Sequence, residues 1–216
     1  MSSKQRLTTF RKLDAKGELG IVLGRLMLAL NDIGLANDAL GSWMKDQEGI
    51  RKDRQRGAKM YFVRMLISHV FEALAVINKI NSTPELLAVV EKSAPETKRA
   101  FDRCAGVVGT EKYKKMKNLR SGLGFHYLDD PVRDAISSQA QKAPDIQLSV
   151  SVGQDTLEWY YEPGDRIVDS AVVRGVFKIP EGADVQKELD AIIHDIQSVG
   201  DDLASFAGYF IMENAP

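Results

Sequence analysis

An arginine and a histidine that lie close together in the chain, Arg120 and His126, are the residues best suited to chemistry. Imidazole titrates near neutral pH, so His126 can exchange protons with a hydroxyl group or a leaving oxygen. A guanidinium group is a permanent planar cation, so Arg120 can hold a phosphate and neutralise the charge that develops on its oxygens. Together the two side chains suit the cleavage of a phosphodiester without a metal ion.

The residues around this pair favour a polyanionic substrate. Five cations oppose the single acid Glu111 between Glu111 and Arg120, which gives a local charge of +4. Because phosphates attract lysine and arginine whatever the base sequence, this segment is a candidate phosphate-binding surface. We expect the following side chains to contact the substrate: Lys114, Lys117, Ser121 and Tyr127.

The segment that carries the pair, NLRSGLGFHY from Asn118 to Tyr127, resembles the motif of the HEPN (higher eukaryotes and prokaryotes nucleotide-binding) superfamily. In that family an arginine, usually followed by a polar residue, precedes a histidine near the end of a bundle helix. Ser121 takes the position that is often asparagine, and its hydroxyl still donates or accepts a hydrogen bond. Many members are metal-independent RNA endonucleases of toxin or phage-defence systems and act as dimers. The resemblance therefore implies RNA as a partner, a homodimer, and catalytic roles for Arg120 and His126.

Histidine and arginine patterns of this kind also have structural explanations. Arg64 and His69 show an equally permitted spacing, but they lie in an apolar helix, so we expect His69 to be a core or interhelical residue. His126 itself is alternatively a structural residue that packs with Phe125 and Tyr127 at a helix end.

Charge is unevenly distributed along a chain whose net charge is only -1. Residues 51–64 carry six cations and one acid, a balance of +5, whereas residues 181–216 carry eight acids and one lysine, a balance of -7. Two interpretations stay open. The basic segments form one phosphate-binding face, or they are solvated helix faces that pair with the acidic C-terminal helix.

The single cysteine and the apolar segments bear on the compartment. Cys104 has no second cysteine with which to form an internal disulfide or a cysteine metal cluster, and we expect it to be a buried small hydrophobe. The N-terminal residues show no export signal. Residues 19–30 are apolar but interrupted by Arg25, which predicts a core helix rather than a membrane span. We therefore expect a cytoplasmic protein without a metal ion or cofactor.

Hydrophobic spacing predicts the elements that must position the Arg120 motif. Helical periodicity extends over residues 18–45, 55–80, 84–92, 95–108, 111–127 and 130–143. Gly122 and Gly124 are expected to loosen the last turns of the fifth of these helices. Residues 146–152 and 157–161 alternate as the two strands of a hairpin, and the β-branched stretch 166–177 predicts a further strand.

The last helix has a regular apolar seam that runs from Val185 to Phe210 in steps of three and four residues. Such a seam closes an intramolecular bundle or pairs with a second chain, and we expect the former.

These observations predict a mainly α fold, a helical bundle with a small β hairpin before the C-terminal helix. We assign residues 1–143 to a HEPN-like bundle, 144–180 to the hairpin and irregular insertion, and 181–216 to the helix that completes the bundle, all in one domain. The expected function is RNA binding or metal-independent RNA cleavage of the defence or toxin type. The alternative is a catalytically inert helical module that binds a protein partner, such as an antitoxin-like protein.

Overall fold

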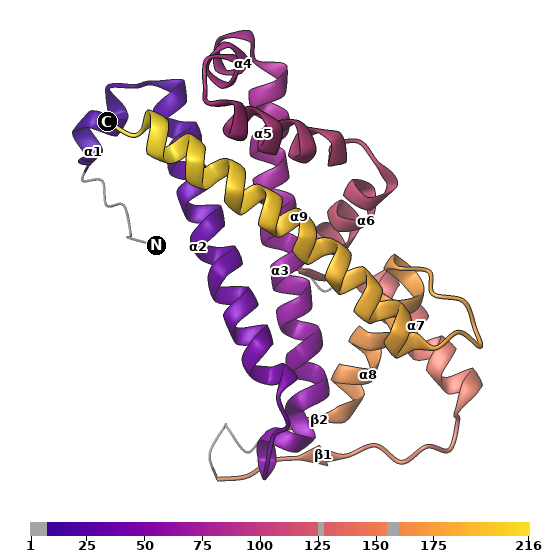
Figure 1. The fold of residues 1–216 in the computed structure, drawn as a ribbon. Coiled ribbons are helices and arrows are strands. Elements are labelled where there is room, and N and C mark those ends of the chain that lie inside the picture. The colour runs from indigo at the N-terminus through magenta and orange to yellow at the C-terminus, as the bar shows by residue number, and fades with distance from the viewer. Residues whose placement is uncertain (1–7, 125–127, 155–159) are drawn as a thin grey trace. The chain divides into compact units, whose positions relative to one another are not determined.

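Apolar residues at helical spacing form the long helices of the protein, seen in a computed structural model that describes residues 8–124, 128–154 and 160–216 (Figure 1). The helices in chain order are α1 (Phe10–Asp14), α2 (Glu18–Met44), α3 (Ile50–Ser82), α4 (Pro84–Glu91), α5 (Pro95–Val107), α6 (Glu111–Leu119), α7 (Asp129–Lys142), α8 (Glu162–Ser170) and α9 (Val185–Asn214). Two π-helical segments, η1 (Arg120–Gly124) and η3 (Ala171–Val176), continue α6 and α8. The predicted mainly α fold is confirmed.

A short antiparallel hairpin precedes the final helix, as predicted. Its strands are β1 (Val150–Ser151) and β2 (Tyr160–Tyr161), with Val150 opposite Tyr161 and Ser151 opposite Tyr160. Leu157 and Trp159, which were expected in the second strand, lie outside the described residues.

The chain divides into two compact units, and each is described by itself. Unit 1 comprises Met1–Gly34, His69–Lys114 and His194–Pro216. Unit 2 comprises Leu35–Ser68 and Lys115–Ile193.

The core of unit 1 is built on the second half of the apolar seam of α9. Val199, Leu203, Phe206 and Phe210 are all buried. The ring of Phe206 lies 5.3 Å from that of Phe101 in α5 and 5.1 Å from that of Phe210. This part of the seam therefore packs within its own chain, which confirms the intramolecular interpretation here.

In unit 2, α7, α8 and η3 pack against one another. The prediction of a strand over residues 166–177 is wrong, because this stretch forms the end of α8 and all of η3. Its β-branched residues favour a strand only where a sheet surface is available to pack them. Here all residues from Asp169 to Val173 are buried. A helix inside a core can bury consecutive residues, whereas a strand with one exposed face would bury only every second residue.

One close helix contact in unit 2 depends on a glycine. Gly57 of α3 lies beside Asp165 of α8, and a Cβ atom at this position would overlap the Asp165 carboxylate. The absence of a side chain at Gly57 thus lets a half-buried acid approach α3.

Two helical stretches, Glu18–Met44 and Arg51–Ser82, are long and apolar enough to cross a membrane by length and composition alone. Core helices of soluble proteins pass the same test, and the apolar windows are 39% and 61% buried within the protein. Val22, Leu23 and Leu26 of the first stretch are buried, whereas Ile21 and Leu28 are exposed.

Candidate functional site

The candidate motif begins where α6 ends and its helical winding changes. Met116, Leu119 and Leu123 are buried and fix one side of this helix in unit 2. Arg120 starts the π-helical segment η1 and is half-buried, while Ser121 is exposed. The glycine-containing turns expected at this point are therefore the place where the α-helix widens. Single π-helical turns are rare and frequently occur at functional sites.

A buried arginine from α3 holds this widened turn. Arg64 is 5% exposed, and its Nη1 atom donates a hydrogen bond to the backbone oxygen of Leu123 at 2.6 Å. Carbonyl groups near a helix end lack intrahelical donors, so the guanidinium group supplies one. The Arg64 side chain also lies over the Tyr61 ring, 5.8 Å from its centroid. Arg64 is thus a positioning residue for η1, a role that the sequence analysis missed.

The predicted substrate-contacting residues are only partly brought together by the structure. Lys117 and Ser121 are exposed one turn apart, next to Arg120 in unit 2. Lys114 is also exposed on α6 but belongs to unit 1, where its Nζ lies 2.7 Å from Glu111. His126 and Tyr127 lie outside the described residues.

Part of the basic charge pairs with the acidic C-terminal helix, as one of the two interpretations predicts. In unit 1 the Lys112 Nζ atom lies 2.5 Å from Asp195. Arg103 of α5, which lies outside both basic segments, also pairs with α9, its Nε atom 2.6 Å from Asp202. In contrast, Lys115 and Lys117 stay exposed on α6. The cations of α6 are therefore divided between an ion pair with α9 and a solvent-facing side.

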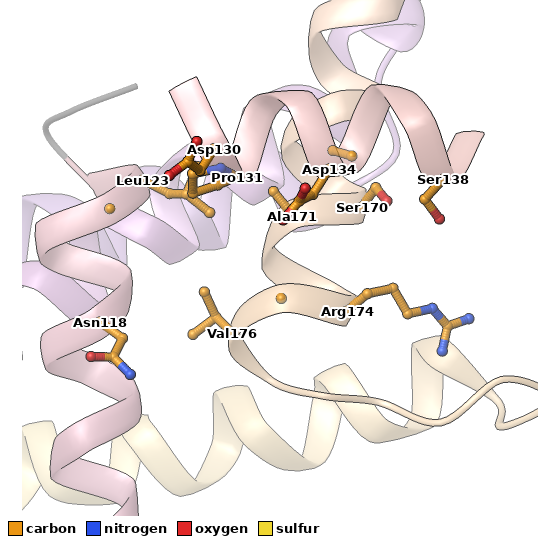
Figure 2. Close-up of a pocket in the computed structure, with 13 residues that line it drawn as sticks. Asn118, Leu123, Asp130, Pro131, Asp134, Ser138, Ser170, Ala171, Arg174 and Val176 are labelled. Atoms are coloured by element: carbon orange, nitrogen blue, oxygen red, sulfur yellow. The ribbon is translucent and has the colours of Figure 1, made fainter. Parts of the chain in front are cut away.

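A cavity of about 500 Å³ lies beside the motif in unit 2 (Figure 2). Asn118 and Leu123 line it from α6 and η1, Asp134 from α7, and Ala171 and Val176 from η3. Both π-helical segments in the described part of the chain thus border the same cavity. Because each such segment interrupts regular helix geometry, this coincidence makes the cavity part of the candidate site.

The cavity wall carries charge of both signs. Asp130 and Asp134 are exposed on α7, and Arg174 points away from Leu123 at the opposite end (Figure 2). The Arg174 guanidinium donates through Nη1 to the backbone oxygens of Ile179 and Pro180, which fixes its orientation. Since phosphates are repelled by the two aspartates, the cavity itself is a poor path for a polyanion.

The basic segment at the start of α3 is used in several ways. Arg56 forms an ion pair with the buried Asp169 of α8, and Arg51 lies over the Trp43 ring at 5.5 Å from its centroid. Arg64 is buried, as described above. The six cations of this segment therefore do not form one uniform exposed face.

The other chemically capable residues have structural surroundings. Cys104 is fully buried in unit 1, which confirms the prediction that it packs as a small hydrophobic residue. Burial raises the pKa of its thiol to about 12, so the thiol is a poor nucleophile. His69 lies between helices, with Nδ1 3.5 Å from Asp32 of α2, as predicted. Within residues 8–124, 128–154 and 160–216, no group of three or more histidine, cysteine or acidic side chains is arranged to hold a metal ion.

Fold and site together define a mainly helical protein in which a basic helix ends in an arginine-initiated π-helical turn. Comparison with protein-family models, with curated proteins and with solved structures found no match.

Proposed function

We propose that the protein is a HEPN-like RNA-binding protein that cleaves RNA without a metal ion. The observation that carries the proposal is the order of side chains along one helix. The exposed cations Lys115 and Lys117 lead directly into the turn that starts at Arg120. Arg64 donates a hydrogen bond to the Leu123 backbone oxygen of the same turn, which limits how far the turn can move when a phosphate binds to Arg120.

In the proposed reaction the 2'-hydroxyl of RNA attacks the adjacent phosphorus, and the bond from phosphorus to the 5'-oxygen breaks. His126 takes the proton from the 2'-hydroxyl or gives one to the leaving oxygen. Arg120 holds the phosphate and offsets the charge that builds on its non-bridging oxygens. The products are a 2',3'-cyclic phosphate and a 5'-hydroxyl end.

Lys117 and Ser121 are proposed to contact phosphates next to the scissile one, with Lys114 and Tyr127 as further contacts. Lysine neutralises a phosphate from a flexible stem, so it suits neighbouring positions along the strand. The serine hydroxyl adds a short hydrogen bond to a phosphate oxygen or a sugar hydroxyl.

RNA binding can be tested separately from cleavage. Lys117→Gln should weaken the binding of a short single-stranded RNA severalfold and reduce the slope of log affinity against log salt by about one, because one phosphate contact is lost. Fluorescence anisotropy across a salt series measures both quantities. The matched control is Lys187→Gln on α9, an exposed lysine outside the site. Equal effects of the two substitutions would contradict a binding role for this face of α6.

A second candidate function is a catalytically inert interaction module, and one observation favours it. Ile21 and Leu28 are 53% and 65% exposed and lie seven residues apart on α2, on one side of the helix. Exposed apolar side chains in such a row are typical of a surface that another protein covers. A second copy of the chain or an antitoxin-like protein would be that partner, and a cytoplasmic location fits both functions.

A further inference from the structure

A second, smaller pocket of unit 2 lies apart from the Arg120 turn and is lined by four basic side chains. Its volume is about 170 Å³. Its wall is formed by α3, α7, α8, η3 and the start of α9 through Arg56, Gln139, Lys142, Arg166, Asp169, Ser170, Val173, Arg174 and Val185. Four cations and one carboxylate therefore line the pocket. The two neutral polar side chains, Gln139 and Ser170, can both donate hydrogen bonds.

Intramolecular contacts hold these cations in place. Arg56 pairs with Asp169, Lys142 pairs with Glu181, and Arg166 Nη2 lies 2.7 Å from Glu162. Glu162 and Glu181 do not line the pocket. Asp165, which also acts on Asp169, is a fourth acid near these four cations, so the pocket attracts an anion through the free donors of its wall rather than through a net charge.

The guanidinium groups keep donors for a ligand. In the part of the chain that the structure describes, Arg56 donates to Asp169 through Nε, and Arg174 donates to two backbone oxygens through Nη1. The remaining nitrogens of both groups have the planar, forked arrangement that matches a phosphate. Their positions are fixed before a ligand binds, which lowers the entropic cost of binding.

The size of the pocket limits what fits inside it. Its volume of about 170 Å³ lies well below the roughly 300 Å³ at which pockets for drug-sized ligands begin. This is enough for a tetrahedral oxyanion but too small for a whole nucleotide. The pocket adjoins a larger cavity of about 640 Å³, with which it shares Arg56, Asp169, Val173 and Val185. Apolar residues such as Met60 and Leu189 line that cavity, so it can take the organic part of a ligand.

Asp169 gives the pocket a chemical preference among phosphates. It is only 6% exposed, and its Oδ1 atom has no hydrogen-bond partner among the residues that the structure describes. Burial raises the pKa of this carboxyl above its ordinary value, and the nearby Arg56 offsets only part of the rise. A phosphate monoester, whose second pKa is about 6, can share a proton with such a carboxyl group. A diester has no comparable proton, so its oxygens would repel the carboxylate.

We propose that this pocket binds the phosphate group of a phosphate monoester, with the four cations and Ser170 as donors and Asp169 as the partner of the phosphate proton. The monoester belongs to a small organic molecule or to the 5'-end of an RNA strand. None of the pocket residues belongs to the Arg120 motif, so the proposal does not require RNA cleavage there. Ser170 and Arg174 also line the cavity beside that motif.

Calorimetric titration of the full chain with phenyl phosphate tests the proposal. Wild-type protein should bind phenyl phosphate saturably and methyl phenyl phosphate, the matching diester, at least about tenfold more weakly. The double variant Lys142→Gln/Arg166→Gln should lose about tenfold or more in affinity for the monoester. Lys142 pairs with the exposed Glu181, and the half-buried partner of Arg166, Glu162, keeps its hydrogen bond from the Ser149 backbone N–H, so this variant should keep its fold. Lys187→Gln is the matched control and should bind as wild type does.

Two further measurements complete the test. Asp169→Asn should bind the diester nearly as well as the monoester, because the repelling carboxylate is replaced by an amide donor. A dinucleotide with a 5'-phosphate, compared with the same dinucleotide lacking it, distinguishes an RNA end from a small metabolite as the source of the phosphate. Absence of saturable binding of phenyl phosphate to wild type, or equal affinity for the diester, would overturn the proposal.

Discussion

At the scale of single residues, polar side chains of unit 2 bind partners that are far away in the chain and cannot be predicted from the local sequence. Arg64 supports a backbone carbonyl that is 59 residues away in the chain, and Arg56 pairs with an acid 113 residues away. Neither partner can be predicted from a helical period, which relates only residues within a few turns. What the sequence does offer is a hint: Arg64 is a lone cation in an apolar stretch, and buried cations require partners.

The two aspartates of α8 make the stability of unit 2 depend on pH in an unusual direction. Burial raises the pKa of Asp169 and of Asp165 above the ordinary value, so the folded state holds protons that the unfolded state releases. Above about pH 4 the unfolded chain therefore binds fewer protons at these sites, and their contribution to the free energy of unfolding falls as pH rises through the raised pKa values. Other carboxylates act in the opposite direction, so only a comparison with a variant isolates this effect.

We expect Asp169→Asn to gain stability relative to wild type as the pH rises from about 4 to about 7, because the variant has no carboxyl group to ionise there. Urea unfolding at several pH values measures this difference. Arg56 is 69% exposed in its side chain, so water can solvate it when its partner is neutral. Asp38→Asn, an exposed position on α2, is the control and should give a curve parallel to that of wild type. A difference between Asp169→Asn and wild type that does not change with pH would contradict the raised pKa.

At the scale of elements, short-range spacing predicted most helices but not the end of the insertion. The apolar seam of α9 recurs every three or four residues, and its residues from Ile196 to Phe210 are buried as expected. The β-branched residues of the stretch 166–177 favour a strand, yet the stretch forms the end of α8 and η3. Its environment, with α7 packed against it, is a tertiary feature that overrides residue preference.

The seam of α9 makes a direct prediction about unit 1. Phe206→Ala should lower the free energy of unfolding by about 3–5 kcal/mol, because it removes a fully buried ring between Phe101 and Phe210. Tyr209→Ala on the same helix should cost much less, since Tyr209 is 51% exposed. Chemical denaturation measures both values. Similar losses for the two variants would mean that the buried face of α9 is assigned incorrectly.

At the scale of the whole molecule, the mainly α fold with its hairpin follows from patterns that the chain repeats locally. The candidate site does not, because it depends on which helices meet. The sequence placed Arg120 near a helix end and glycines after it, and the structure has a π-helical turn there. The hydrogen bond from Arg64 and the adjoining cavity could not be predicted from the sequence, because both depend on how α3, α6 and α7 pack together.

The resemblance of the Arg120 motif to that of HEPN proteins, many of which act as dimers, predicts an association state. If two copies of the motif cooperate, the protein should be a homodimer at micromolar concentration, with the two Arg120 helices near the symmetry axis. Light scattering over a dilution series measures the mass directly. A monomer throughout that range would exclude a site composed of two motifs.

The proposed cleavage of RNA by Arg120 and His126 without a metal ion is tested most directly by one assay. Purified protein is incubated with single-stranded RNA in the presence of a metal chelator, and the ends of the products are identified. We expect 2',3'-cyclic phosphate ends, with rates reduced roughly 10²-fold or more in His126→Ala and by a comparable factor in Arg120→Ala.

His69→Ala is the control in the same assay, because His69 follows an arginine at a similar spacing but lies against Asp32 between two helices. It should lower stability and leave the rate of cleavage by the folded protein unchanged. Unchanged cleavage by His126→Ala, or cleavage that appears only when a divalent metal ion is added, would contradict the account and favour the interaction module.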